Sequence, residues 1–461
     1  MNKSIVGIDL GTSSVKVLQR YANGTMIKAK AKYDNISPAS WWKAICEALA
    51  KIRLQDISAI GLTSQVGTYI VNDTDVIAWN GGVGTEELEQ IKHTYSVDTF
   101  MREISMPHPS IISYPIPRIK YITSHYVDVK RICMPKDFIC EKLTGNYVTD
   151  PYSWRGLAHL EKKDYSEFFL NELGIDRKML PQILDVTNVA GYTRRVQLGG
   201  RFLRSGIPVY VGLNDYYAGL LGMGIYQTGD MFDVTGTSEH IGILEKSIDI
   251  DTKLVSGPYL RENVHYGVTA SSGASLTLGL KQMNFDRLDM DVIRKNNPPI
   301  FLPYLNGERA PIWDADARGL FFGINKGCTK EDMAYAAMEG VVFSLYHIYE
   351  TMGCPKAEQI KVAGGAAVYN TLNQLKADMF GIPVAVLEEN DTSALGAVLT
   401  AAIGAGWYDS MEAAIAAACK VKEVIFPSYE YKEWMNKRYN IYKELYPAVK
   451  MQYQMLKEIN T

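Results

Sequence analysis

Residues 7–13 read Gly-Ile-Asp-Leu-Gly-Thr-Ser, and residues 233–240 read Asp-Val-Thr-Gly-Thr-Ser-Glu-His. Each stretch runs from an apolar, strand-like segment through an Asp to a tight Gly-Thr-Ser turn, and another apolar run follows. The turns begin at Gly11 and Gly236, about half of the 461-residue chain apart. This spacing favours two domains of similar build over a short-period repeat. Because Gly-Thr-Ser is a common turn tripeptide, coincidence is the alternative.

The sequence outside these turns predicts alternating strands and helices. Helical spacing predicts a helix over 40–54 with Ser40 as its N-cap, and β-branched runs predict strands at 57–62, 68–71 and 207–213. The later part predicts, in order, helix 330–352, strand 359–363, helix 370–380, strand 382–387, helix 393–406 and one or two surface helices within 428–461. Such alternation predicts an α/β fold with largely internal sheets, divided into domains 1–224 and 225–461.

Composition and charge narrow the class of protein. Hydrophobic residues make up 47% and charged residues 21%, which is typical of a globular chain. The net charge of −3 gives no electrostatic reason to expect nucleic acid or an anionic membrane as partner. No apolar run approaches the ~20 residues that span a bilayer, and no signal-peptide core is visible. Six cysteines without a CxxC pair are typical of reduced thiols. We therefore expect a cytoplasmic protein, most often an enzyme.

The two turns carry groups that suit phosphate. Backbone N–H groups and hydroxyls in Gly-containing turns form anion-binding concavities. Facing each other across a cleft, the turns would hold the β- and γ-phosphates of a nucleotide, through Gly11, Thr12, Ser13, Gly236, Thr237 and Ser238. Asp9 is placed to hold Mg²⁺, and Lys16 to neutralise phosphate charge; a turn-capping role is the alternative for Asp9. A Walker A motif is absent, which argues against a P-loop enzyme.

Two further segments carry candidate site residues. Asp215 follows an apolar run and precedes a small-residue helix, a position that suits a general base, with a helix N-cap as the alternative. Gly364 and Gly365 separate a strand from a helix that opens near Ala367, and paired glycines there let a flat ligand approach; a plain tight turn is the alternative. The histidines lack metal-ligand spacing, and residues 236–240 miss the GxSxG pattern of serine hydrolases.

Taken together, these segments resemble the FGGY carbohydrate kinase family, in its xylulokinase-like branch. The resemblance runs in order through nearly the whole chain, at 7–16, 134–138, 143–150, 212–224, 233–240, 302–323, 362–384 and 393–402. The most specific match is LPYLNGERAPIWDADARGLFFG at 302–323, which is similar to the signature segment of the family.

The resemblance implies two ribonuclease-H-like (actin-like ATPase) domains with a central cleft that closes on its ligands. The first would bind a small sugar or polyol and the second ATP, with Mg²⁺ as cofactor and a homodimer as a plausible assembly. The γ-phosphoryl group of ATP would pass to a hydroxyl of a sugar, polyol or sugar acid, and Asp215 would accept the proton of that hydroxyl. Gly364, Gly365 and Asn370 would line the adenosine pocket. The acceptor would be bound by Gln65, Trp79, Asn214 and Asp215.

The expected sugar-binding segments depart from the family pattern. Gln65 is followed by Val-Gly-Thr where xylulokinase-like members have Met-His-Gly, and residues 79–83 read Trp-Asn-Gly-Gly-Val where they have Trp-Asn-Asp-Gly-Arg. The Arg-Glu pair of glycerol kinases is also absent. Either another acceptor is used, or groups such as Gln65, Trp79, Glu239 or His240 compensate. We expect a ketopentose such as xylulose.

Other readings of the sequence remain open or are disfavoured. Gluconate, a polyol or another ketose is an alternative acceptor. A non-catalytic sugar- or nucleotide-binding protein on the same scaffold is the alternative function. An Hsp70-like chaperone is disfavoured because too few residues follow the adenosine-like segment, and a ROK-type kinase because its Cys-rich zinc cluster is absent.

Overall fold

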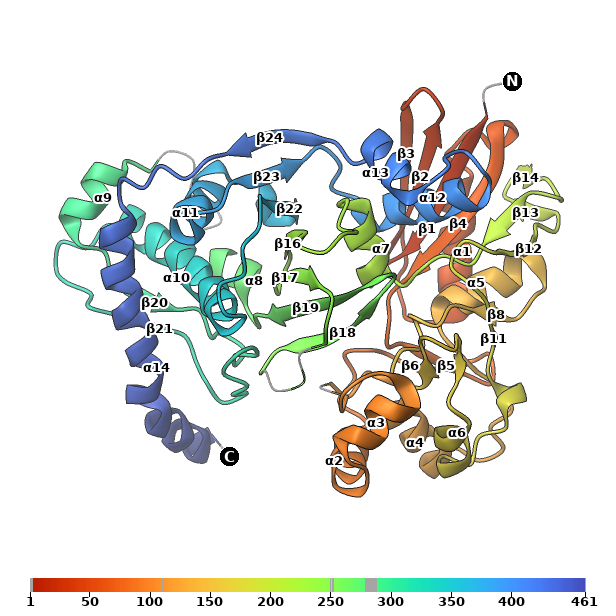
Figure 1. Ribbon diagram of the computed structural model, residues 1–461, viewed down its shortest axis with the longest axis horizontal. Coiled ribbons are helices and arrows are strands. Elements are labelled where there is room, and N and C mark those ends of the chain that lie inside the picture. Colours follow the sequence, from red (N-terminus) through yellow and green to blue (C-terminus); the bar gives the residue numbers. More distant parts are fainter. Residues whose placement is uncertain (1–2, 110, 249, 251–252, 278–287, 461) are drawn as a thin grey trace. The chain divides into compact units, whose positions relative to one another are not determined.

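The computed structural model describes residues 3–109, 111–248, 250, 253–277 and 288–460, and the chain divides into two compact units (Figure 1). The first unit comprises Met1–Tyr226, Gly257–Arg261 and Asp391–Cys419, and the second comprises Gln227–Ser256, Glu262–Asn390 and Lys420–Thr461. The first boundary lies close to the predicted division at 224/225. The structure differs from the prediction in that the chain returns to the first unit twice, bringing helices α12 (Thr392–Gly404) and α13 (Met411–Ala418) into it.

The sheet of the first unit has the strand order β3-β2-β1-β4-β15-β12. Its strands are β1 (Ser4–Leu10), β2 (Ser14–Tyr21), β3 (Met26–Lys32), β4 (Ile57–Ser64), β12 (Val189–Tyr192) and β15 (Pro208–Tyr210). The fully buried β1 pairs antiparallel with β2, as the first Gly-Thr-Ser turn predicts, and parallel with β4. Strand β4 pairs parallel with β15, and β15 pairs antiparallel with β12.

The sheet of the second unit repeats this pattern. Its order is β18-β19-β17-β16-β22-β23-β24, formed by β16 (Met231–Thr235), β17 (His240–Glu245), β18 (Val255–Tyr259), β19 (Glu262–Val268), β22 (Ile360–Gly364), β23 (Val384–Leu387) and β24 (Val421–Ile425). Strand β16 stands where β1 stands, antiparallel to β17 and parallel to β22, and β23 with β24 repeats β15 with β12. The shared order confirms the predicted duplication and the two ribonuclease-H-like domains.

Helices and short strands complete each unit. The first also holds α2 (Thr85–Thr94), α3 (Val97–Ile104), α4 (Pro115–His125), α5 (Pro135–Thr144), α6 (Glu167–Glu172), α7 (Asp215–Gly222), β5 (Tyr69–Val71), β6 (Asp75–Ile77), β7 (Ile132–Cys133), β8 (Val148–Thr149), β9 (Ala158–His159), β10 (Asp164–Tyr165), β11 (Gln182–Ile183), β13 (Val196–Leu198) and β14 (Arg201–Leu203). The second also holds α8 (Ser272–Thr277), α9 (Met290–Asn296), α10 (Lys330–Thr351), α11 (Asn370–Phe380), α14 (Lys432–Asn460), β20 (Ile300–Leu302) and β21 (Leu320–Phe322). Helices α10, α11 and α12 lie close to their predicted ranges.

Two predicted helix starts are wrong. Helix α1 spans Pro38–Leu49, so it begins before the predicted 40–54, because the Ser37 side chain accepts the Ser40 N–H at 3.2 Å and Pro38 suits the first turn. The helix predicted to open near Ala367 is instead a short 3₁₀ turn over Gly365–Val368, and α11 begins at Asn370.

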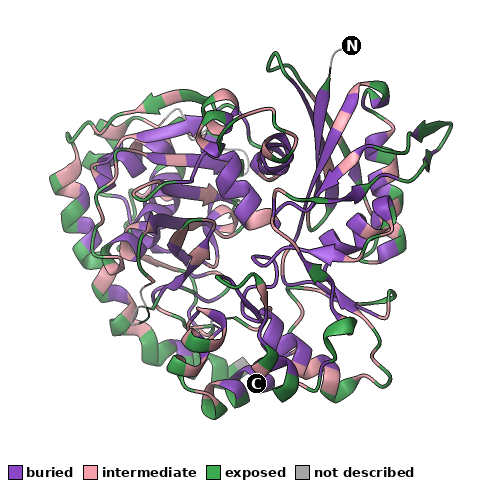
Figure 2. Ribbon diagram, turned by 45° about the vertical axis from the view of Figure 1, so that its right-hand side comes forward, coloured by how far each residue is buried: buried purple, intermediate pink, exposed green. Residues whose placement is uncertain are grey.

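Each unit is built around its own hydrophobic core. Figure 2 shows buried residues along the strands, with exposed residues on the outer sides of the helices. In the first unit Trp41 and Phe138 pack with the residues of β1 and β4, and in the second Phe343 and Tyr442 pack with those of β16 and β22. All six cysteines are free thiols. Within the described part of the chain, every helix is too short or too polar to cross a bilayer.

Helices α7 and α12 of the first unit approach each other at glycine positions. A Cβ added to Gly396 of α12 would lie 1.9 Å from the carbonyl oxygen of Ala218 in α7. A Cβ added to Gly222 of α7 would lie 2.0 Å from the carbonyl oxygen of Thr392. Only glycine permits backbones to pack this closely. The position of α7, which begins at Asp215, therefore depends on its packing against α12.

We predict that Gly396→Ala destabilises the protein although alanine is the better helix former. The added methyl group must displace the α7 backbone, and overpacking of this kind costs ~1–3 kcal/mol. Thermal unfolding monitored by circular dichroism measures the effect. Gly200→Ala is the control, because a Cβ there meets no atom within 4 Å. Equal melting temperatures for the two variants would contradict the packing argument.

Candidate active site

Asp9 lies near the end of the central strand β1, with 6% of its surface exposed. Its Oδ1 is buried and has no hydrogen-bond partner among the described residues. The following turn is closed by the backbone, because the Gly11 N–H donates to the Ser14 carbonyl oxygen at 3.0 Å. Burial, together with the nearby Asp215 carboxylate, raises the pKa of Asp9 to about 7, although Lys16 acts in the opposite direction. The Asp9 oxygen is therefore available to a ligand.

The environment of Asp9 fits a magnesium ion. A buried carboxylate oxygen without a partner is the donor that Mg²⁺ prefers. Among the described residues, no group of three or more His, Cys, Asp or Glu side chains gathers into a metal cluster. Mg²⁺ usually keeps several waters and binds through one or two carboxylates together with substrate phosphates, so a site with Asp9 as its carboxylate is chemically reasonable.

Asp215 is the first residue of α7, and its neighbour Asn214 is the N-cap. The Asn214 side chain accepts the Tyr217 N–H at 2.9 Å, so the N-cap alternative for Asp215 is wrong. Asp215 Oδ1 accepts the N–H groups of Tyr216 at 2.9 Å and Val66 at 3.3 Å. Burial raises the pKa of Asp215 to about 7, while these amides and Arg155 act against the rise. A carboxyl oriented in this way suits proton transfer near neutral pH.

The segment after β4 joins these two carboxylates. The Gln65 N–H donates to the Leu10 carbonyl oxygen of β1 at 2.9 Å, and the next residue, Val66, donates to Asp215. The structure therefore brings four of the predicted site residues, Asp9, Gln65, Asn214 and Asp215, into one region of the first unit.

The remaining predicted residues of the first unit lie on β2, in the first Gly-Thr-Ser turn and on the loop after β6. The Lys16 ammonium, on β2, forms an ion pair with Asp391 Oδ1 at 2.8 Å, just before α12. The Tyr33 hydroxyl donates to the Gly11 carbonyl oxygen and so braces the turn that carries Thr12 and Ser13. Trp79 is 38% exposed and lies on the loop between β6 and α2.

In the second unit, the turn of Gly236, Thr237 and Ser238 joins β16 to β17 and is held by a buried ionic network. The Lys376 ammonium of α11 lies 2.5 Å from both Asp233 Oδ2 and Glu239 Oε1, which flank the turn. Ser272 donates to Glu239. Burial and the adjacent Glu239 hold the pKa of Asp233 well above its usual range, whereas Lys376 lowers the pKa of Glu239 against the effect of its burial. Both carboxylate oxygens of Glu239, which was considered from the sequence as a compensating sugar ligand, are thus engaged by Lys376 and Ser272.

The predicted adenosine segment lies beside this turn. Thr235 of β16 pairs with Gly364 of β22, and the Thr235 hydroxyl accepts the Ala366 N–H at 2.9 Å. Gly364 has a φ of 110°, and a Cβ there would lie 2.1 Å from the Thr235 carbonyl oxygen. Glycine is therefore required at this crossing. The structure places Gly364 and Gly365 next to the second Gly-Thr-Ser turn, and Asn370 follows as the first residue of α11.

Sequence reasoning missed several residues that position the site. Lys376 and Asp233 are charged residues that the fold buries. The quoted stretch 233–240 contained Asp233, but no role was assigned to it, and no motif pointed to Lys376. Arg118, on α4, is fully buried and donates through Nη2 to the carbonyl oxygens of Ala78, Trp79 and Gly81. It therefore holds the loop that carries Trp79, and no motif pointed to it.

The fold is duplicated, one central strand carries a buried carboxylate, and a braced Gly-Thr-Ser turn follows the other. Together these features are those of a two-domain phosphotransferase. Residues 4–222 match the N-terminal domain and residues 221–405 the C-terminal domain of the FGGY family of carbohydrate kinases. The chain belongs to this family and is a carbohydrate kinase, a class of enzyme that takes its phosphoryl group from ATP.

Relatives and solved structures agree with this assignment. The chain is 28% identical to a xylulose kinase of Staphylococcus xylosus, with 96% of this chain and 99% of that protein covered. It is 27% identical to glycerol kinase 2 of Thermotoga maritima, with 89% and 92% covered. The fold is similar to those of a gluconate kinase and a ligand-bound xylulose kinase from Lactobacillus acidophilus, each with a TM-score of 0.85, at 24% and 23% identity. These two matches cover 99% and 98% of this chain and 100% of the other.

We predict that Lys376→Met strongly destabilises the second unit. The substitution leaves two buried carboxyls without their cation, and such a loss typically costs ~3–5 kcal/mol. Urea unfolding followed by tryptophan fluorescence gives the change. Lys437→Met is the control, because Lys437 forms an exposed pair with Glu433 at 2.7 Å and should leave the urea midpoint nearly unchanged. A Lys376 variant as stable as the control would contradict the structural role of the network.

We also predict that Asp215→Asn changes the pH dependence of stability in metal-free buffer. The pKa of Asp215 rises from 3.8 to about 7 on folding, so the folded protein retains a proton that the unfolded chain has lost. The contribution of Asp215 to the free energy of unfolding therefore falls as the pH rises from about 4 to about 7.

The asparagine variant lacks this contribution. The melting temperature of the variant minus that of the wild type should therefore increase from pH 5 to pH 8. Melting scans across this range, with EDTA present, test the sign. Asp34→Asn, at an exposed turn residue, is the control and should not show this increase. A difference in melting temperature between Asp215→Asn and the wild type that stays constant with pH would show that burial does not raise the pKa of Asp215.

Proposed function

We propose that this carbohydrate kinase phosphorylates a ketopentose such as xylulose, with Asp215 as the general base. The observation that carries the proposal is the placement of Asp215 at the start of α7, where two backbone amides orient its carboxyl and burial raises its pKa to about 7. Xylulose kinases among the relatives, matched over nearly their whole length, support the choice of acceptor.

In the proposed reaction, Asp215 accepts the proton of an acceptor hydroxyl. The hydroxyl oxygen forms a bond to the γ-phosphorus of ATP, the bond from that phosphorus to the bridging oxygen breaks, and ADP leaves. Base catalysis of this kind contributes typically ~10²–10⁴ in rate. Positioning of the two reactants and neutralisation of phosphate charge account for most of the rest.

We assign the nucleotide and its cation to the residues around the two turns. Asp9 would hold Mg²⁺ through its buried Oδ1, and the ion, when bound, neutralises charge on the phosphates. Thr12, Ser13 and Lys16 in the first unit, and Thr237 and Ser238 in the second, would bind phosphate oxygens. Gly364, Gly365 and Asn370 would receive the adenosine. We further propose that the enzyme works in the cytoplasm, and a homodimer stays a prediction.

The test is an ADP-release assay with Mg·ATP and a panel of D- and L-ketopentoses, ketohexoses, polyols and aldonates, with a sugar-free blank. We predict ADP formation with xylulose, and a loss of at least ~10²-fold in kcat for Asp215→Asn, with ATP binding retained. Fluorescence titration with a nucleotide analogue measures that binding.

The matched control is Asp185→Asn, which alters a carboxylate that pairs with the half-exposed Lys163. It should turn over at the wild-type rate. Full turnover by Asp215→Asn would overturn its role as base. Binding of ATP and xylulose without ADP formation would favour the non-catalytic alternative.

A further inference from the structure

A small cavity in the first unit opens beside Asp215. It encloses about 260 Å³, part of it open to solvent, and its lining includes Val66, Tyr69, Ser113, Tyr114, Ser153 and Arg155. Val66 connects the cavity to the proposed base, because its N–H donates to Asp215 Oδ1 at 3.3 Å. Val66 therefore belongs both to the lining of the cavity and to the surroundings of Asp215.

Arg155 is the cationic side chain of this lining. It is 6% exposed, and its guanidinium carbon lies 4.6 Å from the centre of the Tyr217 ring and 5.4 Å from that of the Tyr114 ring. Contacts of a guanidinium with aromatic faces restrict its position. Arg155 also acts electrostatically on Asp215, against the rise of its pKa. The cation and the carboxylate therefore belong to one site.

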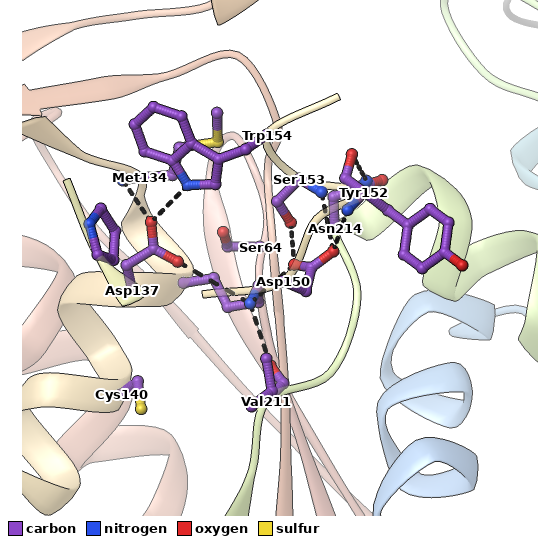
Figure 3. Close-up of polar contacts among 12 residues, drawn as sticks. Ser64, Met134, Asp137, Cys140, Asp150, Tyr152, Ser153, Trp154, Val211 and Asn214 are labelled. Carbon is purple, nitrogen blue, oxygen red and sulfur yellow. Dashed lines mark hydrogen bonds and ion pairs between the residues drawn. The ribbon is translucent and has the colours of Figure 1, made fainter. Parts of the chain in front are cut away.

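A buried hydrogen-bond network fixes the turn that carries Arg155 (Figure 3). Asp150 Oδ1 accepts the N–H groups of Tyr152 and Ser153, both at 2.8 Å, and Asp150 Oδ2 lies 3.0 Å from the Lys136 ammonium. The Asn214 side chain donates to the Tyr152 carbonyl oxygen at 3.3 Å. Because Asn214 also caps α7, one network positions both Arg155 and Asp215.

The loop that carries Trp79 does not supply a charged side chain of its own. Gly81 and Val83 stand where xylulokinase-like members have Asp and Arg. A Cβ at Gly81 would lie 4.0 Å from Arg118 Nη1, an atom without a hydrogen-bond partner among the described residues. Arg118 is fully buried, and its Nη2 donates to three backbone carbonyl oxygens of the loop, so Arg118 holds the loop in place. The charged donor for an acceptor must come from elsewhere.

We propose that Arg155 binds the acceptor in this cavity and determines acceptor specificity, in place of the charged pair missing from the Trp79 loop. Its guanidinium donates to an oxygen of the ketopentose, while the reacting hydroxyl lies at Asp215. The choice of ketopentose rests on the proposed function, whereas the role of Arg155 rests on the cavity and its network.

The test compares Arg155→Leu and Arg155→Lys with the wild type. Calorimetric titration with D-xylulose, in the absence of nucleotide, measures acceptor binding apart from turnover, and steady-state assays give KM for xylulose and for ATP. Arg155→Leu keeps an apolar stem between the tyrosine rings and should raise both Kd and KM for xylulose ~10–100-fold, because a hydrogen bond to a charged donor is lost. KM for ATP should stay within about twofold of the wild-type value.

Arg155→Lys retains the charge but not the planar guanidinium, so its KM for xylulose should lie between those of the leucine variant and the wild type. The matched control is Arg195→Leu, which removes another arginine stacked on an aromatic ring, Phe202 at 4.1 Å, outside the cavity lining. Arg195→Leu should leave Kd and KM for xylulose and KM for ATP unchanged. Circular dichroism and melting scans of each variant separate a lost contact from a lost fold.

Each outcome decides between the proposals. Unchanged xylulose binding in folded Arg155→Leu, or equal increases in KM for xylulose and for ATP, would overturn the role of Arg155 and leave the proposed function intact. If xylulose binds the wild type without being phosphorylated, and Arg155→Leu loses that binding, the role of Arg155 stands and the proposed function fails. Xylulose that neither binds nor reacts would overturn both.

Discussion

The buried ion pair between Lys136 and Asp150 is the interaction on which the segments around Arg155 and Asp215 depend. Lys136 also donates to the Val211 carbonyl oxygen at 3.1 Å, just before α7, and lies 3.9 Å from Asp137. Charges removed from water in this way are tolerated only when their hydrogen bonds are satisfied, and such geometry holds the surrounding chain in one arrangement. The turn that carries Arg155 and the segment that leads into Asp215 are both attached to this pair.

The second unit also contains a buried lysine paired with carboxylates, and there the pairs hold a turn. Lys376 ties together two carboxyls on either side of the turn of Gly236, Thr237 and Ser238, and it comes from a helix far along the chain. In the proposed function this turn binds phosphate with its backbone N–H groups, so those groups cannot also hold the turn in place. Buried side chains around it therefore provide the rigidity, which is what preorganised electrostatic stabilisation requires.

The sequence predicted the fold well because local patterns and topology agree. The two Gly-Thr-Ser turns and the apolar runs around them are short-range features, so the hairpins, the duplication and most helices followed from them.

The start of α1 was misplaced because Ser37 and Ser40 are both plausible caps, and only the side-chain contact separates them. The return of residues 391–419 to the first unit was missed because it depends on long-range packing at Gly396. Asp9 and Asp215 were proposed as site residues from their positions at strand and helix ends, and Asn214 from the family resemblance; their roles stay predictions. Arg155 and Lys376 were not identified, since their roles arise from neighbours far away in the sequence.

The central claim is that this chain transfers the γ-phosphoryl group of ATP to a sugar hydroxyl at Asp215. The most direct measurement is ³¹P NMR of the purified protein with Mg·ATP and D-xylulose, followed until the ATP is consumed. The account predicts one new phosphate-ester resonance that grows in equal amount with ADP, and its absence with Asp215→Asn. ADP accompanied by inorganic phosphate, or ATP that persists unchanged with xylulose present, would contradict it.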